Sequence, residues 1–157
     1  MKLKLHSTSF AAAIAFFGFF LISADIANAQ DRYGFPSGSS HEIVKRIARS
    51  AEDRSDDFKG ELRRALNKSG LDGSAREDRL NDQARRLERA LDRVKKGVDK
   101  RKPYREVQDN VRDAVRAGKD INLTVRNRWR GSGVEREWRR LRDEINALAR
   151  TVNVSRI

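Results

Sequence analysis

The sequence contains no cysteine, and its single methionine is Met1. Disulfides, iron–sulfur clusters and c-type haem are therefore excluded, because each of them needs cysteine. There are only two histidines, His6 and His41, and His6 falls in the targeting segment described below. One remaining histidine cannot supply an axial haem pair or the Glu-x-x-His motifs of di-iron bundles. We therefore expect no cofactor and no metal, and we interpret His41 as a surface residue beside Glu42.

The motifs of familiar active sites are also missing, including Gly-x-Ser-x-Gly, His-Glu-x-x-His and a phosphate-binding glycine loop. We interpret the short glycine-rich segment 131–133 as a turn. Paired carboxylates do occur, but each pair has arginines nearby in the chain, as is typical of solvated helix faces with ion pairs. These pairs are Glu52/Asp53, Asp56/Asp57 and Asp143/Glu144. The chain is therefore predicted not to be an enzyme.

Long apolar runs are absent except near the N-terminus. Two lysines precede an apolar stretch over residues 10–22, and small residues at 27–29 complete the pattern of a secretory signal. We predict that residues 1–29 are a signal peptide cleaved after Ala29. The apolar stretch is shorter than the about 20 residues of a spanning helix, so no transmembrane anchor is expected after cleavage. Export to the periplasm or to the extracellular medium is expected, and the sequence leaves these two open.

Apolar residues recur at helical spacing through most of the remaining chain. Residues 30–40 combine glycine, proline and serine and are predicted to be a flexible leader. Four amphipathic helices follow, and their predicted ranges are about 41–68, 75–98, 103–130 and 133–152. Short turns make consecutive helices antiparallel. The prediction is an all-α, up-down-up-down four-helix bundle domain over 41–157. Two helical hairpins that pair in a homodimer are the alternative, so monomer and homodimer stay undecided.

Each predicted helix carries one apolar seam, in which residues follow at steps of three and four. The first consists of Val44, Ile47, Ala51, Phe58, Leu62 and Ala65, with Leu66 beside it and an interruption at Arg54 or Ser55. The second consists of Leu80, Ala84, Leu87, Leu91, Val94 and Val98. The third consists of Tyr104, Val107, Val111, Ala114, Gly118, Ile121, Val125 and Trp129, and the fourth of Val134, Trp138, Leu141, Ile145, Leu148 and Val152.

Local signals mark the helix boundaries and one weak position. Ser74 with Glu77, and Ser132 with Glu135, have the spacing of capping boxes, in which each partner bonds the backbone amide of the other. Gly118 is the weak position, because a glycine inside a helix costs about 1 kcal/mol relative to alanine. Close approach of a neighbouring helix, or a local kink, would account for it.

The positive charge is the most informative feature. Lysine and arginine total 35 against 23 acidic residues, a formal net charge of +12. Cations gather around residue 100 and around residue 130, and the predicted topology places these two turns at opposite ends of the bundle. The candidate anion-binding residues are Arg93, Lys95, Lys96, Lys100, Arg101, Lys102, Arg105, Arg126, Arg128, Arg130, Arg136, Arg139 and Arg140.

Such ends would attract polyanions through counterion release and bidentate guanidinium contacts. An anionic envelope component or an acidic protein is the expected partner. The simpler alternative is that the arginines form a solvated, helix-favouring surface. A periplasmic holdase is a further alternative, although no Leu-Thr-x-x-Gln repeat is present. Nucleic acid is an unlikely partner for an exported protein. Trp129 and Trp138 resemble a stacking platform, but their seam positions favour core packing.

The final helix resembles the C-terminal helix of uncharacterised small secreted or periplasmic bacterial all-helical proteins, which carry a tryptophan followed by an Asn-x-Leu-Ala core. The matching residues are Trp138, Leu141, Arg142, Ile145, Asn146, Leu148 and Ala149. Thr151 and Val152 stand where an aromatic residue is often found. The resemblance spans about residues 134–154; it implies an exported helical bundle and transfers no catalytic residue.

Overall fold

The computed structural model describes Phe35, residues 38–69 and residues 74–157, and these contain four helices and no strand. The helices are α2 (Gly38–Lys68), α3 (Ala75–Asp99), α4 (Tyr104–Arg128) and α5 (Gly133–Thr151). The predicted signal peptide and most of the predicted leader lie outside the described residues. None of the described helices is long and apolar enough to cross a membrane.

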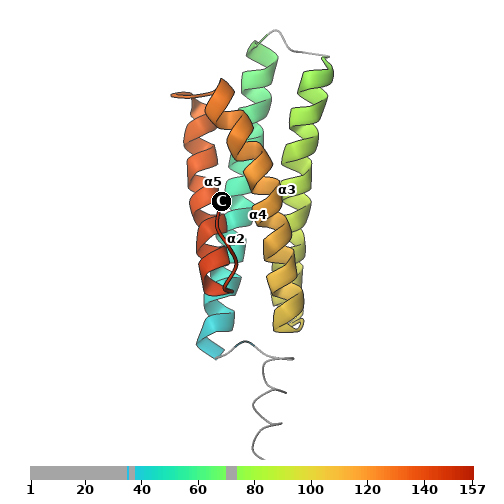
Figure 1. Cartoon of the computed structure of the whole chain (residues 1–157), viewed down its shortest axis with the longest axis vertical. Coiled ribbons are helices and arrows are strands. Elements are labelled where there is room, and N and C mark those ends of the chain that lie inside the picture. Colours follow the sequence, from blue (N-terminus) through green and yellow to red (C-terminus); the bar gives the residue numbers. More distant parts are fainter. Residues whose placement is uncertain (1–34, 36–37, 70–73) are drawn as a thin grey trace, which may run out of the picture.

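The four helices form an antiparallel bundle, which confirms the predicted fold class. α2 packs against both α3 and α5, and α4 also packs against both, so that the helices close into a ring. Figure 1 shows α4 running obliquely across the bundle, while the segment after α5 turns back along it. Consecutive helices run in opposite directions because the turns that join them are only a few residues long.

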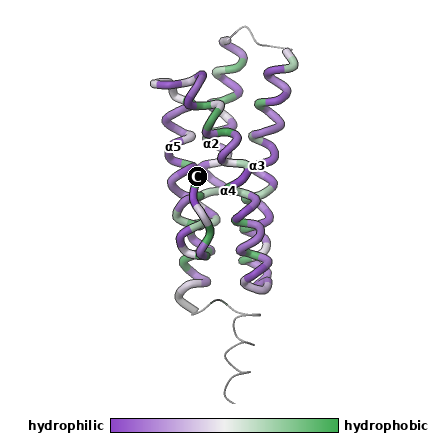
Figure 2. The backbone as a smooth tube through the Cα atoms, viewed as in Figure 1, coloured by the Kyte–Doolittle hydropathy of each residue, from purple (hydrophilic) through white to green (hydrophobic). Residues whose placement is uncertain are grey.

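The seams predicted for α3, α4 and α5 face the interior. Their apolar members are buried except Tyr104, which is half-buried. Figure 2 shows the alternation of hydrophobic and hydrophilic residues that produces these seams along each helix. The largest buried side chain is that of Trp138, which contacts Phe58 of α2 with 5.5 Å between ring centroids. Its indole Nε1 donates to Asn122 Oδ1 at 3.0 Å. The core interpretation of Trp138 is therefore confirmed.

The predicted seam of α2 was wrong in part. Ile47 and Ala65 are only half-buried, and the buried stripe instead includes Ala48, Ser55 and Leu66. This stripe advances in steps that average close to 3.6 residues, so it follows the straight face of an α-helix over its whole length. Ser55 therefore does not interrupt the stripe but belongs to it.

Local interactions mark the starts and the ends of the helices. Ser74 and Ser132 accept the amides of Glu77 and Glu135 as predicted, at 3.2 and 3.3 Å. The Glu135 carboxylate, however, accepts from the Gly131 amide, so the second half of that capping box was wrong. After α3, α4 and α5, the residues with positive φ are Arg101 (50°), Gly131 (77°) and Asn153 (54°).

The structure also corrects the start of the domain. α2 begins at Gly38, within the predicted leader, and Phe35 packs against the core. The ring of Phe35 makes edge contacts with His41 and Tyr104, with centroids 5.2 and 5.4 Å apart. His41 Nε2 lies 3.0 Å from the carbonyl oxygen of Val98, and the His41 side chain is largely buried. The interpretation of His41 as a surface residue was therefore wrong, because an aromatic residue of the preceding segment covers it.

Candidate anion-binding ends of the bundle

The two basic turns lie at opposite ends of the bundle, as the topology requires. The α3–α4 turn shares its end with the start of α2 and the end of α5, whereas the α4–α5 turn lies at the other end (Figure 1). We call these the α3–α4 end and the α4–α5 end. The candidate cations differ in whether a carboxylate already holds them, and this divides the predicted set.

At the α3–α4 end, three exposed cations have no ion pair within the described chain. They are Lys100, Arg101 and Arg105. The Arg101 amide donates to Val98 O at 3.0 Å and the Lys102 amide to Gly97 O at 2.8 Å, a pair of bonds that ends α3 in a Schellman-type cap. Arg101 takes the left-handed position that glycine usually occupies. Lys102 pairs with Glu106 at 3.5 Å, so it is partly neutralised.

Three predicted cations of α3 lie along its flank and are paired. Arg93 contacts Asp113 of α4 at 3.3 Å, and Lys96 contacts Asp92 at 2.7 Å. Lys95 contacts Glu52 of α2 at 2.6 Å. This hydrogen bond to the Glu52 carboxylate is the main reason that the pKa of Lys95 is raised above its ordinary value. These three cations contribute less free positive charge than their sequence positions suggested.

At the α4–α5 end, Arg126, Arg128 and Arg130 are exposed, and none of them has an ion pair in the part of the chain that the structure describes. The Arg128 guanidinium lies 6.0 Å from the centroid of the Trp129 ring, a cation–π distance. Trp129 itself is only 9% exposed and belongs to the core, so it offers little surface for stacking.

The candidate cations of α5 are exposed but paired with carboxylates of the same helix. Arg139 lies 3.7 Å from Glu135, and Arg140 lies 3.2 Å from Glu137, which Arg136 also contacts at 3.3 Å. Spacings of four and three residues bring Arg139 to Glu135 and Arg140 to Glu137 on one helix face, whereas Arg136 and Glu137 are adjacent in the sequence. These arginines therefore lie along the flank of α5, and they do not add to the free cations of the α4–α5 end.

The structure adds cations that the sequence clusters missed. Arg46 and Arg150 are exposed near the α3–α4 end, in the early turns of α2 and the last turn of α5. Lys68 and Arg76 are exposed near the α4–α5 end. All four lack an ion pair among the described residues. Combining the predicted topology with the charge of each helix terminus would have found them, because antiparallel packing brings distant segments to one end.

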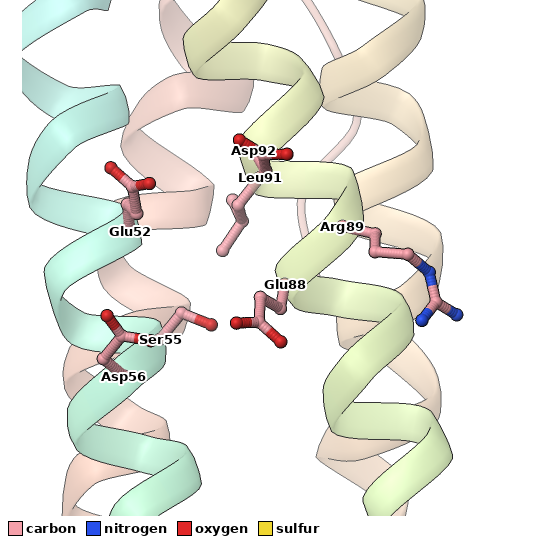
Figure 3. A pocket seen from close by; sticks show the side chains of 7 residues that line it. All are labelled: Glu52, Ser55, Asp56, Glu88, Arg89, Leu91 and Asp92. Atoms are coloured by element: carbon pink, nitrogen blue, oxygen red, sulfur yellow. The ribbon is translucent and has the colours of Figure 1, made fainter.

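A second feature is an acidic groove of about 360 Å³ between α2 and α3. In Figure 3, Ser55 and Glu88 point toward each other across it, and Arg89 points away. Its four carboxylates are already engaged. Lys59 contacts both Asp56 and Glu88, and Glu52 and Asp92 are held by Lys95 and Lys96. Within the described chain, no group of three histidine, cysteine or acidic residues could hold a metal ion. The groove is therefore a place where ion pairs join two helices.

No protein-family model, curated protein or solved structure matches the chain.

Proposed function

We propose that this chain is a non-enzymatic exported protein that binds a phosphate-bearing polyanion of the cell envelope through the free cations at its two ends. Export is part of the proposal and rests on the predicted signal peptide, residues 1–29. An envelope location would place lipid and polysaccharide phosphates within reach.

One observation carries the proposal. Seven of the thirteen candidate cations contact carboxylates, whereas six are exposed and have no ion pair within the described chain. These six divide equally between the two ends of the bundle. They are Lys100, Arg101 and Arg105 at one end, and Arg126, Arg128 and Arg130 at the other. Cations that no internal carboxylate neutralises are available to an external anion.

The chemistry of these groups favours phosphate. Five of the six are arginines, and a guanidinium matches two phosphate oxygens at once, which a single ammonium cannot do. The field from several such groups accumulates over a distance comparable to the Debye length, about 8 Å at physiological ionic strength. Binding should therefore weaken strongly as salt rises.

Charge reversal at each end tests the proposal. The two triple variants are K100E/R101E/R105E and R126E/R128E/R130E, and the matched control is R63E/R86E/R89E. The control changes the net charge equally, at exposed cations within α2 and α3 that also have no ion pair in the described ranges and belong to neither turn. Binding to inorganic polyphosphate and to phosphatidylglycerol vesicles is measured at low and physiological salt.

Each end variant should weaken binding by on the order of 10-fold or more, and the control by much less. Equal losses in all three variants would show that only the net charge matters. Affinity that does not change with salt would refute the proposal. Capture of unfolded proteins at both salt concentrations, without binding of either anion, would favour a holdase instead.

A further inference from the structure

The two basic ends are connected along the outer face of α4. We define this face by seven exposed residues that follow at steps of four and three. They are Arg105, Asp109, Arg112, Arg116, Lys119, Leu123 and Arg126. At 100° per residue these positions lie within a stripe about 100° wide on the helix surface. The stripe runs from Arg105 to Arg126, so it is about 32 Å long at 1.5 Å per residue.

The outer face of α4 has five cations and one acid. Its acid, Asp109, contacts Arg112, and Arg116 contacts Asp113 beside the face at 3.1 Å. Within the described chain, Arg105, Lys119 and Arg126 have no ion pair. These three are spread from the start of the helix to its end, and Asp120, next to Lys119 in the sequence, is an exposed acid with no ion pair among the described residues. The face therefore carries net positive charge along its length.

Leu123 lies near the centre line of this basic face. Its side chain is 63% exposed, and the only other exposed large hydrophobic among the described residues is Ile43, at 40%. Lys119 precedes Leu123 by four residues and Arg126 follows it by three, so both are its neighbours on the helix surface. A single exposed leucine is common on soluble proteins, but here cations flank it on one helix face.

We infer that α4 lies along an anionic lipid bilayer, with the Leu123 side chain inserted between lipid headgroups and Lys119 and Arg126 on lipid phosphates. Peripheral helices bind such surfaces by burying apolar side chains at the interface, while neighbouring lysines and arginines are attracted to the anionic lipids. A soluble polyanion would engage the cations but would offer nothing to the leucine. This inference rests on the proposed function and specifies both its partner and the docking face.

Two measurements test the docking face, with Ile43 as the matched control. Because the chain has no cysteine, a cysteine introduced at either position takes an environment-sensitive fluorophore at that site alone. The label is read on Leu123→Cys and on Ile43→Cys, with vesicles of phosphatidylcholine alone or mixed with phosphatidylglycerol. Vesicle binding is then measured for Leu123→Ser and Ile43→Ser on the isolated protein. All variants begin at Gln30, the residue after the predicted cleavage site, because the apolar residues 10–22 would bind any bilayer by themselves.

The label at position 123 should move to a less polar environment on anionic vesicles, and the label at position 43 should not. Leu123→Ser should weaken binding to these vesicles by on the order of 10-fold, the loss expected when a leucine side chain no longer enters an apolar phase. Its binding to soluble inorganic polyphosphate should be unchanged. Ile43→Ser should match the native protein in both assays.

The failures of this inference and of the proposed function are distinguishable. Equal vesicle binding by Leu123→Ser and Ile43→Ser, with an unshifted label at 123, would overturn the α4 docking face. If charge reversal at the bundle ends still weakened polyphosphate binding more than the control did, the proposed function would stand. If the native protein showed no salt-sensitive binding to polyphosphate or to anionic vesicles, both the docking face and the proposed function would be overturned. Equal binding to uncharged vesicles would also overturn the docking face, because the cations would then contribute nothing.

Discussion

The side chain of Ile157 lies against Gly118 so closely that a Cβ at position 118 would be 2.4 Å from Ile157 Cδ1. Close approach at this glycine was expected from a neighbouring helix. The structure shows that the segment after α5 makes it, with Trp138 of α5 next at 3.5 Å. The Ile157 amide donates to Asn146 Oδ1 at 2.9 Å, and Gln108 Nε2 donates to Val152 O at 2.8 Å. These bonds hold the segment against α4 and α5.

We therefore predict strong coupling between positions 118 and 157. Gly118→Ala alone should stabilise the protein little or destabilise it, because the new methyl group displaces Ile157. In an Ile157→Ala background the same change should stabilise it by about 1 kcal/mol, the usual helix preference for alanine over glycine. Urea unfolding of the native protein, both single variants and the double variant measures the coupling, and additive free energies of unfolding would contradict it.

Ser55 is predicted to be replaceable with a gain in stability. It is 2% exposed, and its hydroxyl group points into the groove between α2 and α3, toward Glu88 (Figure 3). Ser55→Ala should raise the free energy of unfolding by about 0.5 kcal/mol, because alanine is the better helix former. Ser50→Ala is the control, since Ser50 Oγ donates to Glu144 Oε1 at 2.8 Å and this bond would be lost. Thermal unfolding should show a higher Tm for the first variant than for the second.

Arg101 is predicted to favour binding at the expense of stability. Its φ of 50° lies in the left-handed region, which costs a residue with a side chain about 1 kcal/mol relative to glycine. Arg101→Gly should therefore stabilise the protein and weaken its binding to polyphosphate. Lys100→Gly removes an equal charge where φ is −86°, so it should weaken binding without stabilising the fold. A loss of stability in Arg101→Gly would contradict this account.

The ion pair between Lys95 and Glu52 predicts a pH dependence. The pKa of Lys95 is raised in the folded protein, chiefly by its hydrogen bond to Glu52, so the pair stabilises the fold fully below the unfolded lysine pKa of about 10.4. This contribution is lost as the pH rises through the folded pKa. Lys95→Met should therefore be less stable than the native protein at neutral pH, and the gap should close above that range.

Denaturant unfolding from pH 7 to 11.5 measures this gap. Lys100→Met is the control, because it removes an exposed lysine that has no ion pair in the described part of the chain, and it should change the stability little. A gap that persists undiminished at the highest pH would show that packing of the Lys95 side chain, rather than its charge, stabilises the fold.

Much of the fold was predictable because helix periodicity and capping are local. The seams of α3, α4 and α5, and the serine caps Ser74 and Ser132, follow from residues a few positions apart. The stripe of α2 was less predictable, because a buried serine among apolar residues looks like an interruption. The environment of His41 depends on Phe35 and Val98, and contacts over such separations leave no periodic signal in the sequence.

The candidate site was predictable only as a set of cations. Arg93 and Lys95 lie in the same cluster as Lys100 and Arg101, yet the partners of the first two are on α4 and α2. Which cations stay free of carboxylates is decided by how the helices face one another, and the sequence contains no direct record of it.

The sequence by itself determined four amphipathic helices, their order and the surplus of positive charge, because each depends on composition or on spacings within one helix. Only the tertiary structure decided that Ile157 fills the space at Gly118 and which cations stay unpaired. It also showed that Leu123 lies exposed on a basic face. These features arise from contacts, or their absence, between segments that meet only when the bundle closes.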